Sequence, residues 1–156
     1  DSKKLDAATR ADLFERIVDY AHAIGIGLAS AAEIDALNIR RATFLAMRRA
    51  IRALPIAPAH VHVDGNALPD DLPCAAQTLV QGDALCLSIA AASIIAKVTR
   101  DRLMIRLHQQ DTRYGFNSHM GYGTPAHLAA LERHGPSRFH RRSFAPVRNR
   151  LAVTEV

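Results

Sequence analysis

The stretch Ser88-Ile-Ala-Ala-Ala-Ser-Ile-Ile-Ala-Lys-Val-Thr-Arg-Asp101 says most about the fold, because its spacing predicts one long amphipathic helix. At about 100° per residue, one side of this helix carries an apolar stripe made of Ala90, Ile94, Val98 and Ile105. Asp101 falls within that stripe. A carboxylate facing a core must be neutralised, hydrogen-bonded or bound to a cation, because an unpaired buried charge is costly. Asp101 is therefore a candidate site residue, and the alternative is a salt bridge with Lys97 or an arginine neighbour.

Outward from this helix, predicted strands and helices alternate along the chain. Period-two patterns predict strands at 24–28, 61–63 and 78–80. Helical spacing and capping residues predict helices at about 6–21, from 30, at 39–54, at 88–107 and at 125–134. Gly25 and Gly27 leave one face of the first strand without side chains, so that another segment can approach it closely.

This alternation indicates an α/β layer architecture with at least partly parallel strand pairing. Ligands of such sheets gather beyond the carboxyl ends of the strands. Asp64 lies at such an end, where the strand stops in Asp64-Gly-Asn66. The alternative role for Asp64 is to start a turn through its own side chain.

Length and composition favour one globular domain. At 156 residues we expect a single domain at 1–150 and a tail at 151–156. No apolar run reaches the roughly 18 residues of a membrane span and no signal-peptide core follows the N-terminus, so a cytoplasmic protein without a membrane partner is expected. Cys74 and Cys86 lack metal-site spacing and are expected to be reduced thiols.

The charge favours a polyanionic partner. The net charge is +5, and five arginines crowd the last twenty residues: Arg138, Arg141, Arg142, Arg148 and Arg150. Their clustering indicates a phosphate-contacting edge, although a basic surface also occurs in proteins that bind no nucleic acid.

Several side chains are candidates for contact with nucleic acid. Tyr122 stands between two glycines before a helix start, where its ring can stack on a base or sugar; alternatively it packs over the core. Ser93 and Lys97 lie one helical turn apart and can reach a phosphate, or are helix-surface residues. His119 and His140 are candidates for phosphate contact or proton shuttling.

Metal chemistry is indicated for the acids more than for the histidines. Two carboxylates such as Asp64 and Asp101 suit a hard cation such as Mg²⁺ or Mn²⁺. Paired-metal hydrolysis of a phosphodiester needs more carboxylates than these two. His60 and His62 share a strand face, but no further ligand completes a zinc pattern.

Taken together, the segments resemble bacterial ribonuclease HII over nearly the whole chain. The matching stretches are Asp1-Ser-Lys-Lys-Leu5, Glu33-Ile-Asp-Ala-Leu-Asn-Ile39, Val63-Asp-Gly-Asn66, Gly82-Asp83, Ser88 to Asp101, Tyr114-Gly-Phe116, Gly121-Tyr-Gly-Thr124 and His140-Arg-Arg-Ser-Phe144. Each motif alone is weak, but their order and spacing together are specific.

The resemblance implies a ribonuclease H-like fold with a mixed central sheet flanked by helices, and four acids that bind Mg²⁺ or Mn²⁺. Two of the acids correspond to Asp64 and Asp101. The others form an adjacent Asp-Glu pair followed by a Gly-Arg-Gly turn, and this sequence contains neither motif. The resemblance also implies phosphate contacts at Ser2 and Lys3 and stacking by Tyr122.

Two positions depart from the family pattern. Met120 and Gln81 stand where the family often carries lysine, so each removes a possible phosphate contact.

The function implied is that of an endonuclease of DNA replication and repair. It would hydrolyse the RNA strand of RNA–DNA hybrids, including single ribonucleotides embedded in duplex DNA, with no obligate protein partner. We expect the first strands of the fold to be missing here, which leaves this chain marginally stable and nearly inactive. Two alternatives remain: a non-catalytic nucleic-acid binding module, and a structural domain of the same fold that engages a protein.

Overall fold

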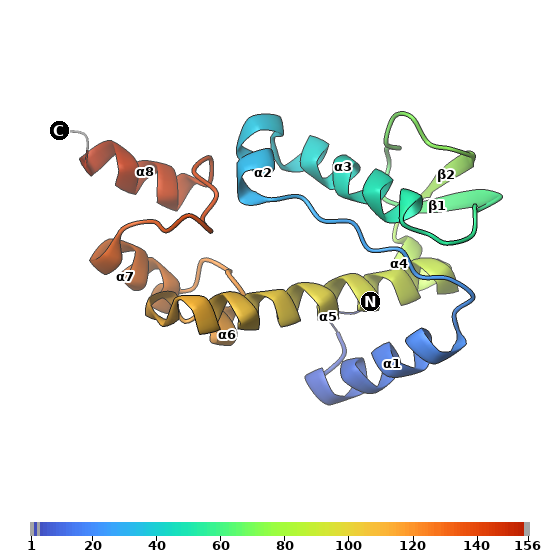
Figure 1. Cartoon of the computed structure of the whole chain (residues 1–156), viewed down its shortest axis with the longest axis horizontal. Coiled ribbons are helices and arrows are strands. Elements are labelled where there is room, and N and C mark those ends of the chain that lie inside the picture. Colours follow the sequence, from blue (N-terminus) through green and yellow to red (C-terminus); the bar gives the residue numbers. More distant parts are fainter. Residues whose placement is uncertain (1, 3, 155–156) are drawn as a thin grey trace. The chain divides into compact units, whose positions relative to one another are not determined.

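The computed structural model describes residue 2 and residues 4–154, with side chains up to residue 151. Within it the chain forms two compact units, one made of Asp1–Ala29 and Thr43–Thr99 and the other of Ser30–Ala42 and Arg100–Val156. Its elements, shown in Figure 1, are α1 (Ala7–Tyr20), α2 (Ala31–Leu37), α3 (Ile39–Arg52), β1 (His60–Asp64), β2 (Ala75–Leu79), α4 (Gly82–Leu85), α5 (Leu87–Gln110), the 3-10 helix η1 (Thr112–Tyr114), α6 (Phe116–His119), α7 (Pro125–His134) and α8 (Ala145–Thr154).

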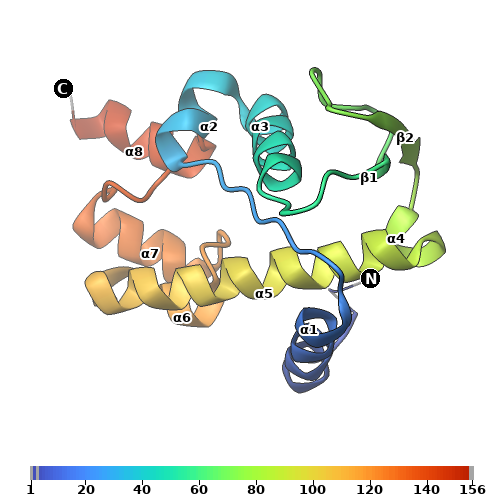
Figure 2. The same ribbon diagram turned by 45° about the vertical axis from the view of Figure 1, so that its right-hand side comes forward.

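A small parallel sheet lies in the first unit. β1 and β2 run side by side (Figure 2), and their register runs from His60 opposite Ala75 to Asp64 opposite Leu79. The predicted parallel pairing is confirmed for these strands. β2 begins at Ala75, earlier in the chain than the predicted start at Thr78.

The prediction of a strand at 24–28 is wrong, because these residues belong to no strand or helix. Their glycines lie instead against the backbone of α3. A Cβ atom on Gly25 would collide with the carbonyl oxygen of Ala50, and one on Gly27 with that of Ala46. The expectation that another segment approaches the bare face is therefore confirmed, but that segment is a helix.

Each unit has its own apolar core. In the first unit, Phe14 of α1 packs with Ile94 and Ile95 of α5. In the second unit the buried core residues are Tyr114, Phe116, Leu131 and Val147.

The apolar stripe predicted for α5 is partly wrong. Ile94 is buried and Val98 packs against it, but Ile105 is 41% exposed. The part of α5 within the second unit instead turns Met104 and Leu107 toward that unit's core. The buried side of the helix therefore changes along its length, because each half packs against different neighbours.

Local capping follows the predictions closely. Ser30 and Glu33 form the capping box of α2. α7 begins with Thr124 as its N-cap and Pro125 in its first turn, and Gly135 ends it. Among the described residues, no helix is long and apolar enough to cross a membrane.

Candidate active site

Asp64 is held at the carboxyl end of β1 by a backbone contact from the first residue of α4. Its Oδ1 accepts a hydrogen bond of 2.8 Å from the amide of Gly82, while the amide of Gly65 donates to the carbonyl of Leu79 at 3.0 Å. The side chain thus binds Gly82 rather than the turn that follows it. The residue is exposed, so the fixed carboxylate is open to a ligand.

The space around Gly82 is tight. A Cβ atom there would lie 2.5 Å from Cδ1 of Ile89 and 3.2 Å from Cβ of Leu79. It would also stand 3.5 Å from Oδ1 of Asp64, in ordinary contact with the carboxylate. The Gly82-Asp83 motif therefore brings a bare backbone amide up to Asp64.

Asp101 is half-buried on α5. It is not an unpartnered charge, and neither is Lys97 on the same helix. Asp64 belongs to the first unit and Asp101 to the second. The oxygen ligands that they offer suit Mg²⁺ or Mn²⁺, but nowhere among the described residues do three His, Cys, Asp or Glu side chains group closely enough to hold a metal ion. The donor chemistry fits the implied metal, and the ligand set is partial.

Tyr122 is presented to solvent on a well-braced loop. Its residue is 53% exposed, and the guanidinium of Arg100 lies 5.2 Å from the ring centroid. Arg100 Nη1 also donates to the carbonyl of Met120 at 2.7 Å. Met120 and Gly121 both have positive φ, at 49° and 75°. The exposure of the residue supports a role in stacking and argues against a core-packing role.

Three buried histidines lie next to this loop, and sequence reasoning missed their association. His127 Nε2 is 3.1 Å from His140 Nε2, and the rings of His119 and His127 stack with centroids 4.4 Å apart. Burial lowers the pKa of His140 to about 4, and the neighbouring His127 contributes. Burial also lowers the pKa of His127. Because His119 and His140 are each only 8% exposed, direct contact of either with phosphate is the wrong interpretation.

The remaining residues predicted to contact nucleic acid differ in burial and in their partners. Ser2 is buried, and its carbonyl accepts from Nε of Arg10 at 2.8 Å. Lys3 lies outside the described residues. Lys97 is half-buried on α5. Ser93 donates to the carbonyl of Ala90 at 2.8 Å within its own helix, which supports its alternative role as an ordinary helix residue.

A second association that the sequence did not show surrounds Cys86. Its Sγ lies 3.1 Å from the hydroxyl of Ser88 and 3.4 Å from Nδ1 of His62. The Ser88 and His62 contacts lower the pKa of the Cys86 thiol to about 6. Both cysteines are free thiols, as predicted.

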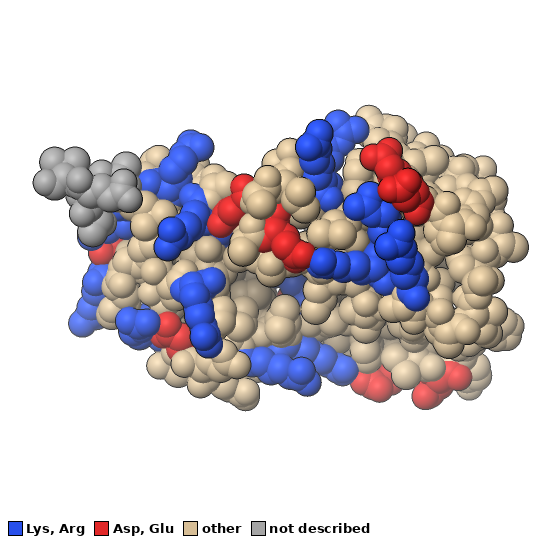
Figure 3. All heavy atoms as spheres, turned by 45° about the horizontal axis from the view of Figure 1, so that its top comes forward, with Lys and Arg blue, Asp and Glu red and all other residues tan. Residues whose placement is uncertain are grey.

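The basic side chains are spread among acids rather than isolated. On the face drawn in Figure 3, Lys and Arg side chains lie with Asp and Glu among them. Two arginines near the C-terminus lie over neighbouring rings, Arg138 over Phe139 at 4.8 Å and Arg141 over Phe144 at 4.9 Å. These two guanidinium groups therefore already contact aromatic rings of the same chain.

Comparison with known proteins gives one consistent result. The family model described as "Ribonuclease HII" matches residues 1–147. The chain is 57% identical over 152 residues to "Ribonuclease HII" of Parvibaculum lavamentivorans, with 97% of this chain and 56% of that protein covered. It is 56% identical over 148 residues to "Ribonuclease HII" of Paraburkholderia xenovorans, with 95% of this chain and 59% of that protein covered. This chain thus spans less than two thirds of either relative.

A solved structure confirms the fold. The ribonuclease H2 from Pyrococcus horikoshii matches with a TM-score of 0.79 at 23% identity, over 99% of this chain and 81% of that one. The predicted α/β class and ribonuclease H-like fold are therefore confirmed. The predicted mixed sheet is not seen among the described residues, where β1 and β2 pair in parallel.

Proposed function

Because the chain belongs to the ribonuclease HII family, we propose that it carries part of the active site of an endonuclease. This enzyme hydrolyses the RNA strand of RNA–DNA hybrids, including single ribonucleotides embedded in duplex DNA. The observation that carries the proposal is the exposed Asp64 at the end of β1, fixed through Oδ1 by the Gly82 amide. Its location in the cytoplasm and a role in replication and repair belong to the same proposal.

Asp64 and Asp101 are the proposed metal ligands and catalytic residues, with Mg²⁺ or Mn²⁺ as the ion. Bound ions of this kind activate water and stabilise the leaving oxygen of a phosphodiester. The contribution of the chain is orientation: the Gly82 amide occupies one oxygen of Asp64, which directs the carboxylate before any ligand arrives. Such preorganisation lowers the cost of binding a cation.

Nucleic-acid contacts are proposed at Tyr122, Lys97, Ser2 and Lys3. The exposed ring of Tyr122, with Arg100 beside it, supports base or sugar stacking. Lys97 is assigned to phosphate on its charge and its position on α5. The buried Ser2 would act through its backbone or through the placement of its neighbours.

The chain by itself is proposed to cut slowly. Its 156 residues contain no adjacent Asp-Glu pair, so two of the four acids implied by the family resemblance are not in it. A metal pair held by two carboxylates has too little negative charge around it to bind tightly.

The test is cleavage and binding of a duplex that contains one embedded ribonucleotide. We expect binding by the purified chain in Mn²⁺, slow cutting at the ribonucleotide, and no cutting after chelation of the metal. Asp64→Asn and Asp101→Asn should each remove cutting and leave binding in place. Cutting that persists in either variant would exclude that residue from the site.

One alternative has an observation in its favour. Since the described residues hold no group of three metal-binding side chains, a non-catalytic nucleic-acid binding module is the second candidate. Binding of the hybrid without any metal-dependent cutting, and without calorimetric binding of Mn²⁺, would favour it.

A further inference from the structure

The loop that carries Tyr122 rests on a line of hydrogen bonds through two buried histidines. His127 Nδ1 is 2.9 Å from the carbonyl oxygen of Tyr122, and His127 Nε2 is 3.1 Å from His140 Nε2. At the other end, His140 Nδ1 lies 3.0 Å from the amide of Ser137 and 2.9 Å from its hydroxyl. We call this line, from Ser137 through His140 and His127 to Tyr122, the histidine relay.

The two ends of the histidine relay decide where its protons lie. A backbone amide can only donate, so His140 Nδ1, which receives the amide of Ser137, carries no proton. A carbonyl oxygen can only accept, so His127 Nδ1 must carry a proton for Tyr122. His140 Nε2–H then donates to the bare Nε2 of His127. Both rings are neutral, and they are opposite tautomers.

A charged histidine cannot occupy either position without breaking the line. A second proton on His127 would bring two N–H groups together at the 3.1 Å contact, and one on His140 would face the N–H of Ser137. Burial disfavours the charged form as well, since it lowers the pKa of His140 and His127. The hydrogen-bond directions and the burial therefore both favour neutral rings at His127 and His140.

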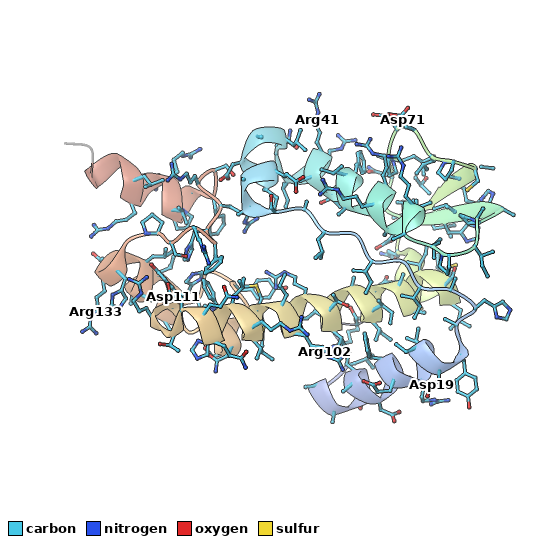
Figure 4. All side chains as sticks on the ribbon, viewed as in Figure 1. Asp19, Arg41, Asp71, Arg102, Asp111 and Arg133 are labelled. Carbon is cyan, nitrogen blue, oxygen red and sulfur yellow. The ribbon has the colours of Figure 1, made fainter. Side chains whose placement is uncertain are left out.

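The surroundings of the relay add few charges. His119 stacks on His127. Its own tautomer follows from its partners, because the amide of Gly121 donates to its Nδ1 and its Nε2–H donates to the carbonyl of Tyr114. Asp111, at the end of α5 (Figure 4), acts weakly on His140 and is paired with Arg113 at 2.8 Å. The ring of Tyr114 lies 4.6 Å from that of His140.

We propose that His127 and His140 are positioning residues that hold the Tyr122 backbone, and through it the exposed ring, in the orientation that stacks on a hybrid duplex. This rests on the proposed function, since the stacking partner is the RNA–DNA substrate. The relay contacts the carbonyl oxygen of Tyr122 and not its ring, which keeps the guanidinium of Arg100 beside it. The loop then binds without first being ordered, which favours affinity.

Binding of a labelled embedded-ribonucleotide duplex, followed by fluorescence anisotropy, separates this role from a merely structural one. His127→Ala should weaken binding about tenfold, the scale of one lost positioning contact. His127→Asn keeps a donor where Nδ1 stood and should stay within about threefold of the wild type. The matched control is His134→Ala, an exposed histidine on the same helix, which should change nothing.

A double-mutant cycle shows whether His127 acts through Tyr122. In a Tyr122→Ala background, adding His127→Ala should weaken binding by less than about twofold, because the residue being positioned is gone. Circular dichroism confirms that each variant folds. Equal losses with and without Tyr122, or an Asn variant as weak as the Ala variant, would overturn the positioning role.

The proton assignments are tested without any substrate. Two-bond ¹H–¹⁵N correlation spectra at pH 5.5 should show His127 as the Nδ1–H tautomer and His140 as the Nε2–H tautomer, both neutral. The same tautomer on both rings, or a charged ring, overturns the relay even if the duplex binds normally. If the assignments hold but the wild type binds no hybrid, the proposed function fails and the binding role of the relay fails with it.

Discussion

Asp64 in the first unit and the histidine relay in the second hold polar groups in opposite surroundings, one exposed and charged, the other buried and neutral. Asp64 keeps a charge exposed, and a single 2.8 Å contact from a backbone amide orients it. The relay lies in a buried place and carries no charge. His127 and His140 must both be neutral to hydrogen-bond to each other and to the backbone at the two ends of the relay. An exposed charge needs only orientation, whereas a buried polar group needs every partner in place.

In this comparison, the largest expected effect is that of Asp64→Asn, which tests the exposed carboxylate. The asparagine oxygen still accepts from Gly82, so the free energy of unfolding should hardly change, whereas the charge that binds the cation is lost. We expect cleavage of the embedded-ribonucleotide duplex to fall about 10³-fold, or about 4 kcal/mol. Cleavage in Mn²⁺ over long incubations and urea unfolding measure the two effects.

Asp70→Asn is the matched control, since it removes the same charge from an exposed acid of the same unit. It should leave both cleavage and stability unchanged. Equal losses in the two variants would mean that net charge, rather than the position of Asp64, governs the activity.

Gly82→Ala tests the support beneath Asp64. The added methyl would lie 2.5 Å from Cδ1 of Ile89 and 3.2 Å from Cβ of Leu79, so either the Ile89 side chain or the start of α4, which donates to Asp64, must shift. We expect the free energy of unfolding to fall by about 2 kcal/mol, with weaker Mn²⁺ binding by calorimetry.

The control for Gly82→Ala is Gly135→Ala. Gly135 has a positive φ of 68°, but a methyl added there would meet no atom within 4 Å, so its cost of about 1 kcal/mol comes from the backbone alone. Weaker metal binding in the Gly135 variant would show that general destabilisation, and not displacement of the Gly82 amide from Asp64, is responsible.

These two regions also differ in how far the sequence alone reveals them. Asp64 was predictable because a strand, its end and the following turn are neighbours in the chain. The contact between His127 and His140 spans 13 residues and exists only after α7 and the following loop have packed. Similarly, the bare face at Gly25 and Gly27 was visible in the sequence, but the identity of its partner was not. Local patterns predict elements and exposed motifs, and buried polar partners depend on tertiary packing.

Acid should weaken the second unit through His140. Its pKa is about 4 in the folded chain and 6.5 in the unfolded chain, so the neutral ring stabilises the fold fully above pH 6.5. This stabilisation decreases as the pH falls from 6.5 and is lost by about pH 4. We expect it to contribute about 2 kcal/mol, somewhat less than the full shift would give, because the ring is not completely dry.

His140→Gln isolates this contribution, since glutamine does not titrate and can still donate to His127. Urea unfolding at pH 7 and pH 4.5 should show a smaller loss of stability in the variant than in the wild type. Other titrating groups are common to both proteins and cancel. An identical loss would mean that the pKa of His140 is close to normal.

The smallest expected effect distinguishes the relay from the helix cap that lies beside it. The hydroxyl of Thr124 accepts from the amide of His127 at 3.3 Å, so the start of α7 is held both by this cap and, through the ring of His127, by the relay. Thr124→Ala should cost about 1 kcal/mol, typical of a lost N-cap. If the relay sets the ring of His127, the tautomers of His127 and His140 should survive in this variant, and Thr124→Ser should restore the stability. Loss of the opposite tautomers together with the cap would instead make the relay a consequence of the helix start, and the contrast with the singly held Asp64 would disappear.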